Sequence, residues 1–242
     1  MNKSFLVFLS LLSVIVARPV LAAEPAVKTP TACEINAKQG AVIFKENFDS
    51  DLSAWVSEFV AAPDSSIRID NKKLLIDVAG GATVWLKQPL SGNYQISYTR
   101  KVIMNQGKND RLSDLNQFWM ASDPHSSSLF TRTGIFEEYD GLRLYYVGIG
   151  GNTNTTSRFR KYLGTGERVL ITDLQDAAHM LKANHSYQID ISVFNGCTQL
   201  RVDGQVYFSY QDSEPLKEGY FGFRTTQSRQ EIDNVVIYHL VF

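Results

Sequence analysis

The chain has 242 residues, of which 44% are hydrophobic, 20% charged and 12% aromatic. This apolar content excludes a disordered or collagen-like chain, and the length suits one large domain or two small ones. Lysine and arginine (24) nearly balance aspartate and glutamate (25), so the formal net charge is −1. We expect no general binding of nucleic acid, because there is no basic excess to neutralise a phosphate backbone.

Residues 1–23 predict a secretory signal peptide. Lys3 gives a positive start, residues 5–17 are almost all apolar, and the small residues Ala22 and Ala23 follow. The apolar stretch is short for a membrane span, and a retained anchor is the alternative. We therefore expect a protein that is periplasmic or secreted, with no membrane attachment after cleavage.

Residues 24–40 are rich in proline and small side chains and predict a flexible leader before one domain at residues 41–242. Cys33 lies in this leader, and Cys197 follows a turn-like Asn195-Gly196. Export favours a disulfide between the two cysteines, and two unpaired thiols are the alternative. Their wide separation does not match the spacing of a zinc site.

From residue 41 onward, short apolar segments alternate with turn residues. Asp203-Gly204 predicts a hairpin, and one short helix is expected at residues 173–181. Many short strands without amphipathic helices between them predict an all-β sandwich or jelly roll. The expected strands are residues 42–44, 66–70, 73–78, 83–86, 94–102, 141–149, 157–162, 187–194, 198–202, 206–210, 219–224 and 234–241.

Residues 105–136 interrupt this rhythm, because they are polar and turn-rich apart from Phe118-Trp119-Met120. A long excursion inside a compact β domain is usually a functional loop or a lid. Its side chains Arg111, Asp114, Asn116 and Trp119 would then join a binding cleft, and local ion pairing is the alternative.

The densest group of polar and aromatic residues lies between residues 139 and 162. Side chains alternate along a strand, so Tyr146 faces one way and Tyr145 the other, while Arg158, Arg160 and Tyr162 share a face. Packing of the tyrosines and a solvated face for the arginines are the alternatives.

A glycine-rich turn separates those two segments. Gly148, Gly150 and Gly151 allow a tight reversal that would bring Asn152 and Asn154 beside the arginines. The expected result is a concave face of Tyr, Asn and Arg, residue types that bind sugar hydroxyls, carboxylates and rings.

Acidic side chains near the two ends of the domain suggest a structural calcium site. Terminal strands of a sandwich often lie side by side, so Glu46, Asp49 and Asp233 would supply oxygen ligands. Capping and turn hydrogen bonds are the alternative. No other cofactor is expected.

Several motifs together resemble one group of proteins. They are Asn47-Phe48-Asp49, the segments 109–116 and 118–124, the block 145–162, and the closing segments 219–224 and 232–234. The chain resembles secreted concanavalin-like jelly-roll proteins of bacterial polysaccharide-utilisation systems, found near genes for degrading rhamnogalacturonan and other acidic polysaccharides. The resemblance covers nearly all of residues 41–242, and it implies a jelly-roll β-sandwich with a carbohydrate-related role.

A polysaccharide lyase is the hypothesis that best fits these residues. Arg158 and Arg160 would neutralise a uronic-acid carboxylate, assisted by Asn152 or Asn154. A tyrosine with an arginine-lowered pKa, Tyr146 first and Tyr145 or Tyr162 next, would act as base and acid.

Two alternatives stay open. A glycoside hydrolase would need a pair of carboxylates, and a binding module without catalysis would need exposed aromatics such as Trp85, Trp119 or Tyr146. The candidate carboxylates are Asp110, Asp114, Glu137, Glu138 and Asp140.

Overall fold

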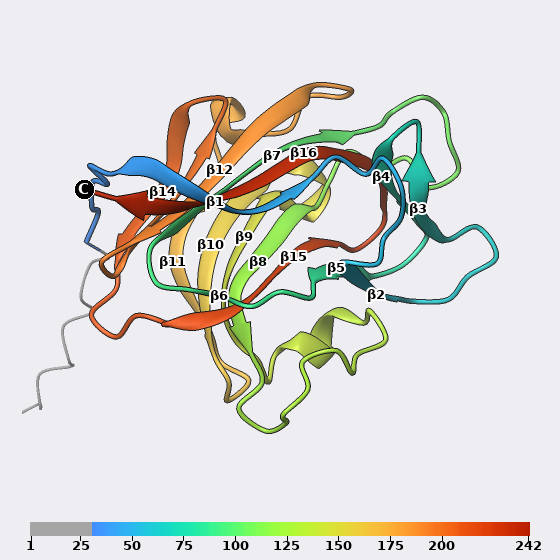
Figure 1. The fold of residues 1–242 in the computed structure, drawn as a ribbon. Coiled ribbons are helices and arrows are strands. Elements are labelled where there is room, and N and C mark those ends of the chain that lie inside the picture. Colours follow the sequence, from blue (N-terminus) through green and yellow to red (C-terminus); the bar gives the residue numbers. More distant parts are fainter. Residues whose placement is uncertain (1–30) are drawn as a thin grey trace, which may run out of the picture.

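Alternating side chains give the sheets of this protein one core-facing side. In β7 (Tyr94–Val102), for example, every second residue is buried from Tyr94 to Val102. The computed structural model describes residues 31–242, and it shows two antiparallel sheets packed as a sandwich (Figure 1). The prediction of an all-β jelly-roll sandwich is confirmed. The predicted signal peptide and the first part of the leader lie outside the described residues.

The first sheet contains the two ends of the described chain side by side, because β1 pairs with β16 (Figure 1). Its remaining strands follow the order β14-β13-β12-β7-β16-β4-β3. Their bounds are β1 (Lys38–Glu46), β3 (Ser66–Asp70), β4 (Lys73–Val78), β12 (Ser186–Phe194), β13 (Cys197–Val202), β14 (Gln205–Gln211) and β16 (Ser228–Val241).

The second sheet follows the order β11-β10-β9-β8-β15-β5-β2, and β6 pairs with β15. Its bounds are β2 (Trp55–Phe59), β5 (Ala82–Leu86), β6 (Leu90–Ser91), β8 (Leu115–Ser122), β9 (Arg143–Gly150), β10 (Thr156–Leu163), β11 (Arg168–Leu174) and β15 (Glu218–Thr225).

Several sequence expectations need correction. The helix expected at residues 173–181 is wrong: β11 runs to Leu174, and a single 3-10 turn, η2 (Ala177–His179), follows. Asp176 caps this turn, because its side chain accepts a hydrogen bond from the Ala178 amide (3.1 Å). The first strand begins at Lys38, within the predicted leader, rather than at residue 42. The hairpin at Asp203-Gly204, between β13 and β14, is confirmed.

The segment 105–136 is not one loop, because β8 passes through it. Both faces of β8 are covered, and its first seven residues are all buried, including the polar Asn116 and Gln117. A strand buried on both sides lacks the alternation that marks a half-exposed strand. The true excursion follows β8, at residues 123–142, and we call it the cover loop.

Two apolar clusters lie on opposite sides of the second sheet. The larger fills the space between the sheets and includes Trp55, Tyr98 and Phe223. The smaller, with Trp85, Phe118, Tyr139, Tyr146 and Tyr162 among its members, lies on the outer face under the cover loop. The cover loop, which contains η1 (Phe136–Tyr139), is the yellow-green segment at the bottom of Figure 1.

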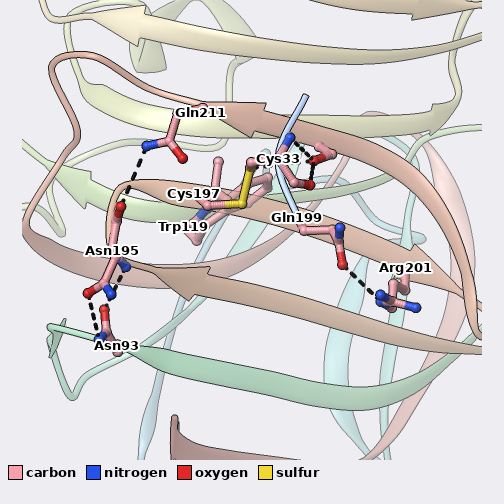
Figure 2. Close-up of a disulfide and its surroundings, with 10 residues drawn as sticks. Cys33, Asn93, Trp119, Asn195, Cys197, Gln199, Arg201 and Gln211 are labelled. Atoms are coloured by element: carbon pink, nitrogen blue, oxygen red, sulfur yellow. Dashed lines mark hydrogen bonds between the residues drawn. A yellow bond between two sulfur atoms is a disulfide. The ribbon is translucent and has the colours of Figure 1, made fainter. Parts of the chain in front are cut away.

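A disulfide between Cys33 and Cys197 ties the segment before β1 to β13 (Figure 2). The two Cα atoms are 6.0 Å apart, and 164 residues separate the cysteines in sequence. The same segment is also held by the Cys33 amide, which donates to Ser209 Oγ (2.9 Å). Of the two alternatives for the cysteines, the structure therefore contains the disulfide. Within residues 31–242, no helix has the length and apolar character needed to cross a membrane.

Candidate functional site

A cleft of about 280 Å³ opens on the outer face of the second sheet. Strands β8, β9, β10 and β11 form its floor, and Phe136 of the cover loop forms part of its wall. The predicted site residues that line it are Asp114, Asn116, Tyr146, Asn152, Arg158 and Arg160. The structure therefore brings these Tyr, Asn and Arg residues together in one cleft.

Strand register aligns polar residues in one row across the outer face, and we call it the polar row. It passes from one edge of the sheet to the other, and its middle crosses the cleft floor. From β11 to β2, the aligned residues are Asp173, Arg158, Gly148, Asn116, Arg224, Thr83 and Glu58.

The adjacent row is mostly aromatic and supports the cleft from one side. Register aligns Arg160 with Tyr146, and Tyr146 with Phe118. The next position in this row is Gly222, which has no side chain. The Trp85 ring therefore lies over Gly222 and stacks on Phe118, with ring centroids 5.5 Å apart. The Arg160 guanidinium lies above the Tyr146 ring, 6.0 Å from its centroid.

Of the three arginines that line the cleft, two are paired with a carboxylate, and Arg111 is paired with the cleft residue Asp114. Arg158 Nε lies 3.1 Å from Asp173 Oδ2, Arg168 pairs with Asp140, and Arg111 pairs with Asp114. Among the described residues, the Arg160 side chain has no ion-pair or hydrogen-bond partner. Its positive charge is therefore available to a ligand.

Gly148 creates the hollow in the floor of the cleft. A side chain at this position would collide with the Tyr146 hydroxyl and with Asn116 Oδ1, so both polar atoms converge above the glycine. Asn116 is only 2% exposed, and its Oδ1 atom has no hydrogen-bond partner. A buried acceptor without a partner costs about 1–3 kcal/mol, so a donor from a ligand would offset a real penalty.

The pKa of Tyr146 differs from the expectation. Burial raises its pKa well above the ordinary value for tyrosine, and the nearby Tyr162 raises it further. The charges of Arg160, Arg224 and Arg168 lower it without outweighing burial. Burial likewise raises the pKa of Tyr162 to about 12. The prediction of an arginine-lowered tyrosine pKa is therefore wrong, and Tyr146 is a neutral hydroxyl at pH 7.

Two predicted binding residues face the space between the sheets instead of the cleft. Trp119 Nε1 donates to Thr198 Oγ1 (3.0 Å), and the Tyr145 hydroxyl donates to Asp212 Oδ2 (2.5 Å). Both rings belong to the inter-sheet core. Tyr162 does share a face with the arginines, but it is fully buried in the outer-face apolar cluster and does not line the cleft.

The turn after β9 supplies Asn152 to the cleft. Asn152, Thr153 and Asn154 all adopt left-handed backbone conformations, with φ between 52° and 60°. Asparagine tolerates this region, whereas a β-branched threonine rarely adopts it. The Asn154 side chain donates to the Leu181 carbonyl (2.9 Å) and accepts from its amide (2.7 Å). Asn154 therefore fixes the turn, and its side chain is not free to contact a ligand.

The carboxylates considered for hydrolysis are dispersed. Asp110 Oδ1 lies 2.9 Å from Arg229 Nε, and Glu138 accepts hydrogen bonds from Thr133. Glu137 is exposed and Asp140 is paired with Arg168. Among these candidates only Asp114 lines the cleft, so the carboxylate pair that hydrolysis requires is not formed.

The acidic residues considered for calcium do not gather either. The terminal strands do lie side by side, as expected. However, Asp49 pairs with Lys72 (3.3 Å), Glu46 accepts from the Phe48 amide (2.7 Å), and Asp233 accepts from the Asn234 amide (2.7 Å). From residue 31 to the end of the chain, no group of three or more His, Cys, Asp or Glu could hold a metal ion.

Sequence reasoning missed Arg168, Arg224 and Phe136. Arg168 begins β11, a strand that was not expected, and its guanidinium lies 4.6 Å from the centroid of the Phe136 ring. Arg224 was noted only as part of a closing strand. The alternation of side chains along residues 219–224 indicates on which face of the strand Arg224 lies. The neighbouring sequence does not indicate that the cover loop lies over that face.

Comparison with known proteins agrees with this architecture. The model of a family described as "Domain of unknown function (DUF6250)" matches residues 76–235. No curated protein matches the chain. Likeness to solved structures, at the identities found, concerns the fold alone.

Three of those structures illustrate the range. A Bacillus subtilis protein of unknown function with a galectin-like fold is 17% identical, with a TM-score of 0.69 over 85% of this chain and 99% of its own. Carbohydrate-binding module CBM66 from Bacillus subtilis is 12% identical, with a TM-score of 0.53 over 76% and 95%. Bacillus licheniformis β-glucanase is 11% identical, with a TM-score of 0.57 over 84% and 99%. The chain thus has a concanavalin-like jelly-roll fold, and it belongs to the DUF6250 family.

Proposed function

We propose that this protein binds an acidic carbohydrate, one that carries uronic-acid carboxylates, in the cleft on the outer face of its second sheet. The single observation that supports this most is Arg160, which lines the cleft without an acidic partner while the arginines around it are paired. A guanidinium binds a carboxylate through two parallel hydrogen bonds, so this is the group that Arg160 suits best.

The other cleft atoms suit sugar hydroxyls. Asn116 Oδ1 is an acceptor without a partner, the Tyr146 hydroxyl lies beside it, and Asn152 is exposed at the rim. Carbohydrate-binding modules and glucanases with the same fold lend further support. The disulfide suits an oxidising compartment, which agrees with a periplasmic or secreted protein. A bacterial polysaccharide-utilisation setting, predicted from the resemblance, is part of the same proposal.

Calorimetric titration with matched ligands tests the proposal. Oligogalacturonate and alginate oligosaccharides would each be compared with their carboxyl-reduced, neutral forms. A hydrogen bond to a charged group contributes about 1.5–3 kcal/mol, so we expect roughly tenfold to hundredfold weaker binding of the neutral forms. Equal affinity for acidic and neutral forms would contradict a carboxylate subsite.

A second candidate is β-elimination on the same ligand, and it is favoured by the Tyr146 hydroxyl, which lies near Asn116 Oδ1 in the cleft that Arg160 also lines. A base would remove the proton at C5, the C–H electron pair would form the C4–C5 double bond, and the C4–O bond would break. An acid would then protonate the leaving oxygen. Arg160 would stabilise the carboxylate while negative charge develops on it.

Product chemistry separates the two candidates. Elimination would produce an unsaturated uronide that absorbs in the ultraviolet, and Tyr146→Phe would abolish the signal. Because burial keeps Tyr146 protonated, the rate should rise about tenfold per pH unit from neutral to alkaline pH while the protein stays folded. Reducing ends without absorbance would indicate hydrolysis, and binding without either product would leave recognition as the function.

A further inference from the structure

We infer that the cleft receives the end of a saccharide chain and not an internal segment. The inference rests on the proposed function, because it concerns the same cleft and the same ligand class. It comes from the polar row, which is open to solvent over one half of the sheet and covered over the other.

Exposure along the polar row changes abruptly at the centre of the sheet. On the β11 side, the side chains of Asp173 and Arg158 are 21% and 27% exposed. Asn116, at the centre, is 2% exposed, and Arg224 beyond it is completely buried. The row therefore enters the cleft from the β11 edge and disappears under the cover loop after Asn116. A chain lying along the row would meet a blind end there.

The cover loop is fixed to the sheet at this blind end. The Gly134 carbonyl accepts a hydrogen bond from Arg224 Nη1 (2.6 Å). Farther along the row, buried Glu58 accepts from the Arg132 amide (2.7 Å) and from the Tyr139 hydroxyl (2.9 Å). Opening the loop would leave the buried charges of Arg224 and Glu58 without these partners, which strongly disfavours an open loop. The wall is therefore part of the folded structure.

A second side of the cleft is also closed. The Phe136 ring packs edge-on against Tyr146, with ring centroids 6.3 Å apart. The Arg168 guanidinium lies over the same Phe136 ring, 4.6 Å from its centroid. Arg168 in turn pairs with Asp140 of the cover loop. The directions of Arg158 and of the turn at Asn152 are not closed by the cover loop, and a ligand chain would leave the cleft there.

The volume agrees with a chain end. About 280 Å³ lies just below the roughly 300–1,000 Å³ typical of sites for drug-sized ligands. This accommodates a terminal sugar and part of its neighbour. The carboxylate of that terminal sugar would contact Arg160, and one of its hydroxyls would donate to Asn116 Oδ1.

A length series tests the inference. The full chain would be titrated calorimetrically with galacturonate and alginate oligomers of increasing defined length and with the long polymers. Recognition of an end predicts one protein bound per chain at every length, with a molar Kd that changes less than about threefold beyond the shortest oligomers. Arg160→Gln should weaken binding at least tenfold at every length, and Arg68→Gln, on the first sheet, should leave it unchanged.

The failures are distinguishable. If more protein molecules bind per chain as the chain lengthens, and Arg160→Gln abolishes this binding, end recognition is overturned while the proposed function stands. Absence of binding by any length of either acid, or binding that Arg160→Gln leaves unchanged, would overturn the proposed function and the inference together.

Discussion

At the scale of single residues, the cleft depends on one residue without a side chain and on polar side-chain groups that have no ion-pair or hydrogen-bond partner within residues 31–242. Arg160 is available because the nearby carboxylates are engaged by Arg111, Arg158 and Arg168. Gly148 leaves the space into which the Tyr146 hydroxyl and Asn116 Oδ1 point. Charge, acceptor and space therefore meet within one small volume, and each can be removed by a single substitution.

Gly148→Ala tests whether that space is needed. The added methyl group would occupy the floor of the cleft and displace the Tyr146 hydroxyl, so we expect binding of acidic oligosaccharides to weaken at least tenfold. Overpacking typically costs about 1–3 kcal/mol, so the melting temperature should fall by a few degrees without unfolding. Gly141→Ala is the matched control, because nothing lies within 4 Å of its added methyl group. Unchanged binding by Gly148→Ala would place the ligand elsewhere.

At the scale of elements, the cover loop converts one half of an open sheet face into a wall. Buried charged side chains hold it in place, and Arg132 makes several of the contacts within the loop itself. Arg132 Nη2 lies 2.6 Å from Asp123 Oδ2, and its other nitrogens donate to carbonyls of the same loop. The loop is therefore stabilised by charge as well as by its aromatic contacts.

This arrangement predicts loosening of the cover loop in acid. Burial alone would raise the pKa of Asp123, but hydrogen bonds from Arg132 and from the His125 amide lower it below the ordinary value. The stabilisation is therefore complete above the ordinary pKa of about 3.9 and is lost as the pH falls through the lower, native pKa. The protection of the amides of residues 123–142 against exchange, relative to the intrinsic rate at each pH, should fall below about pH 4.

Asp123→Asn provides the control for that experiment. At neutral pH it should lower the free energy of unfolding of the loop by about 1.5–3 kcal/mol, the contribution of a hydrogen bond to a charged group. It should also reduce the acid dependence of exchange in the loop, whereas Asp70→Asn on the edge strand β3 should not. Acid exchange that is identical in the wild type and Asp123→Asn would show that another group holds the loop.

At the scale of the whole molecule, the two sheets share one core, and the disulfide joins the start of the described chain to β13. A bridge across 164 residues restricts the unfolded chain strongly. The double variant Cys33→Ser/Cys197→Ser should therefore fold but lose about 2–5 kcal/mol of stability in denaturant titration. Its binding should be unchanged, because the bridge lies near Trp119 of the inter-sheet core (Figure 2) and neither cysteine lines the cleft. A loss of binding in the folded variant would contradict this separation.

The part of the fold that could be predicted is the part that the alternation of polar and apolar side chains along a strand reveals. Strands with one exposed face, such as β3 and β4, were predicted with their observed bounds because their side chains alternate. The strand β8 was not, because both of its faces are covered and its polar residues are buried. What covers the second face is the cover loop, and that contact is long-range, so no window of sequence contains it.

The same limit applies to the site. Alternation correctly placed Arg158 and Arg160 together, and it correctly separated Tyr145 from Tyr146. It could not say which of those two faces lies outward, so Tyr145 and Trp119 were assigned to a ligand although they belong to the core. The tyrosine pKa was predicted from neighbouring charge alone, whereas burial, a property of the folded molecule, sets its direction.

The most direct measurement is calorimetric titration of the wild type, Arg160→Gln and Arg68→Gln with the same acidic oligosaccharide. Arg160 is the unpaired charge in the cleft, and Arg68 is an exposed arginine on the opposite sheet. The account predicts at least tenfold weaker binding by Arg160→Gln, with Arg68→Gln indistinguishable from the wild type. Equal binding by all three proteins would contradict an acidic-carbohydrate site in this cleft.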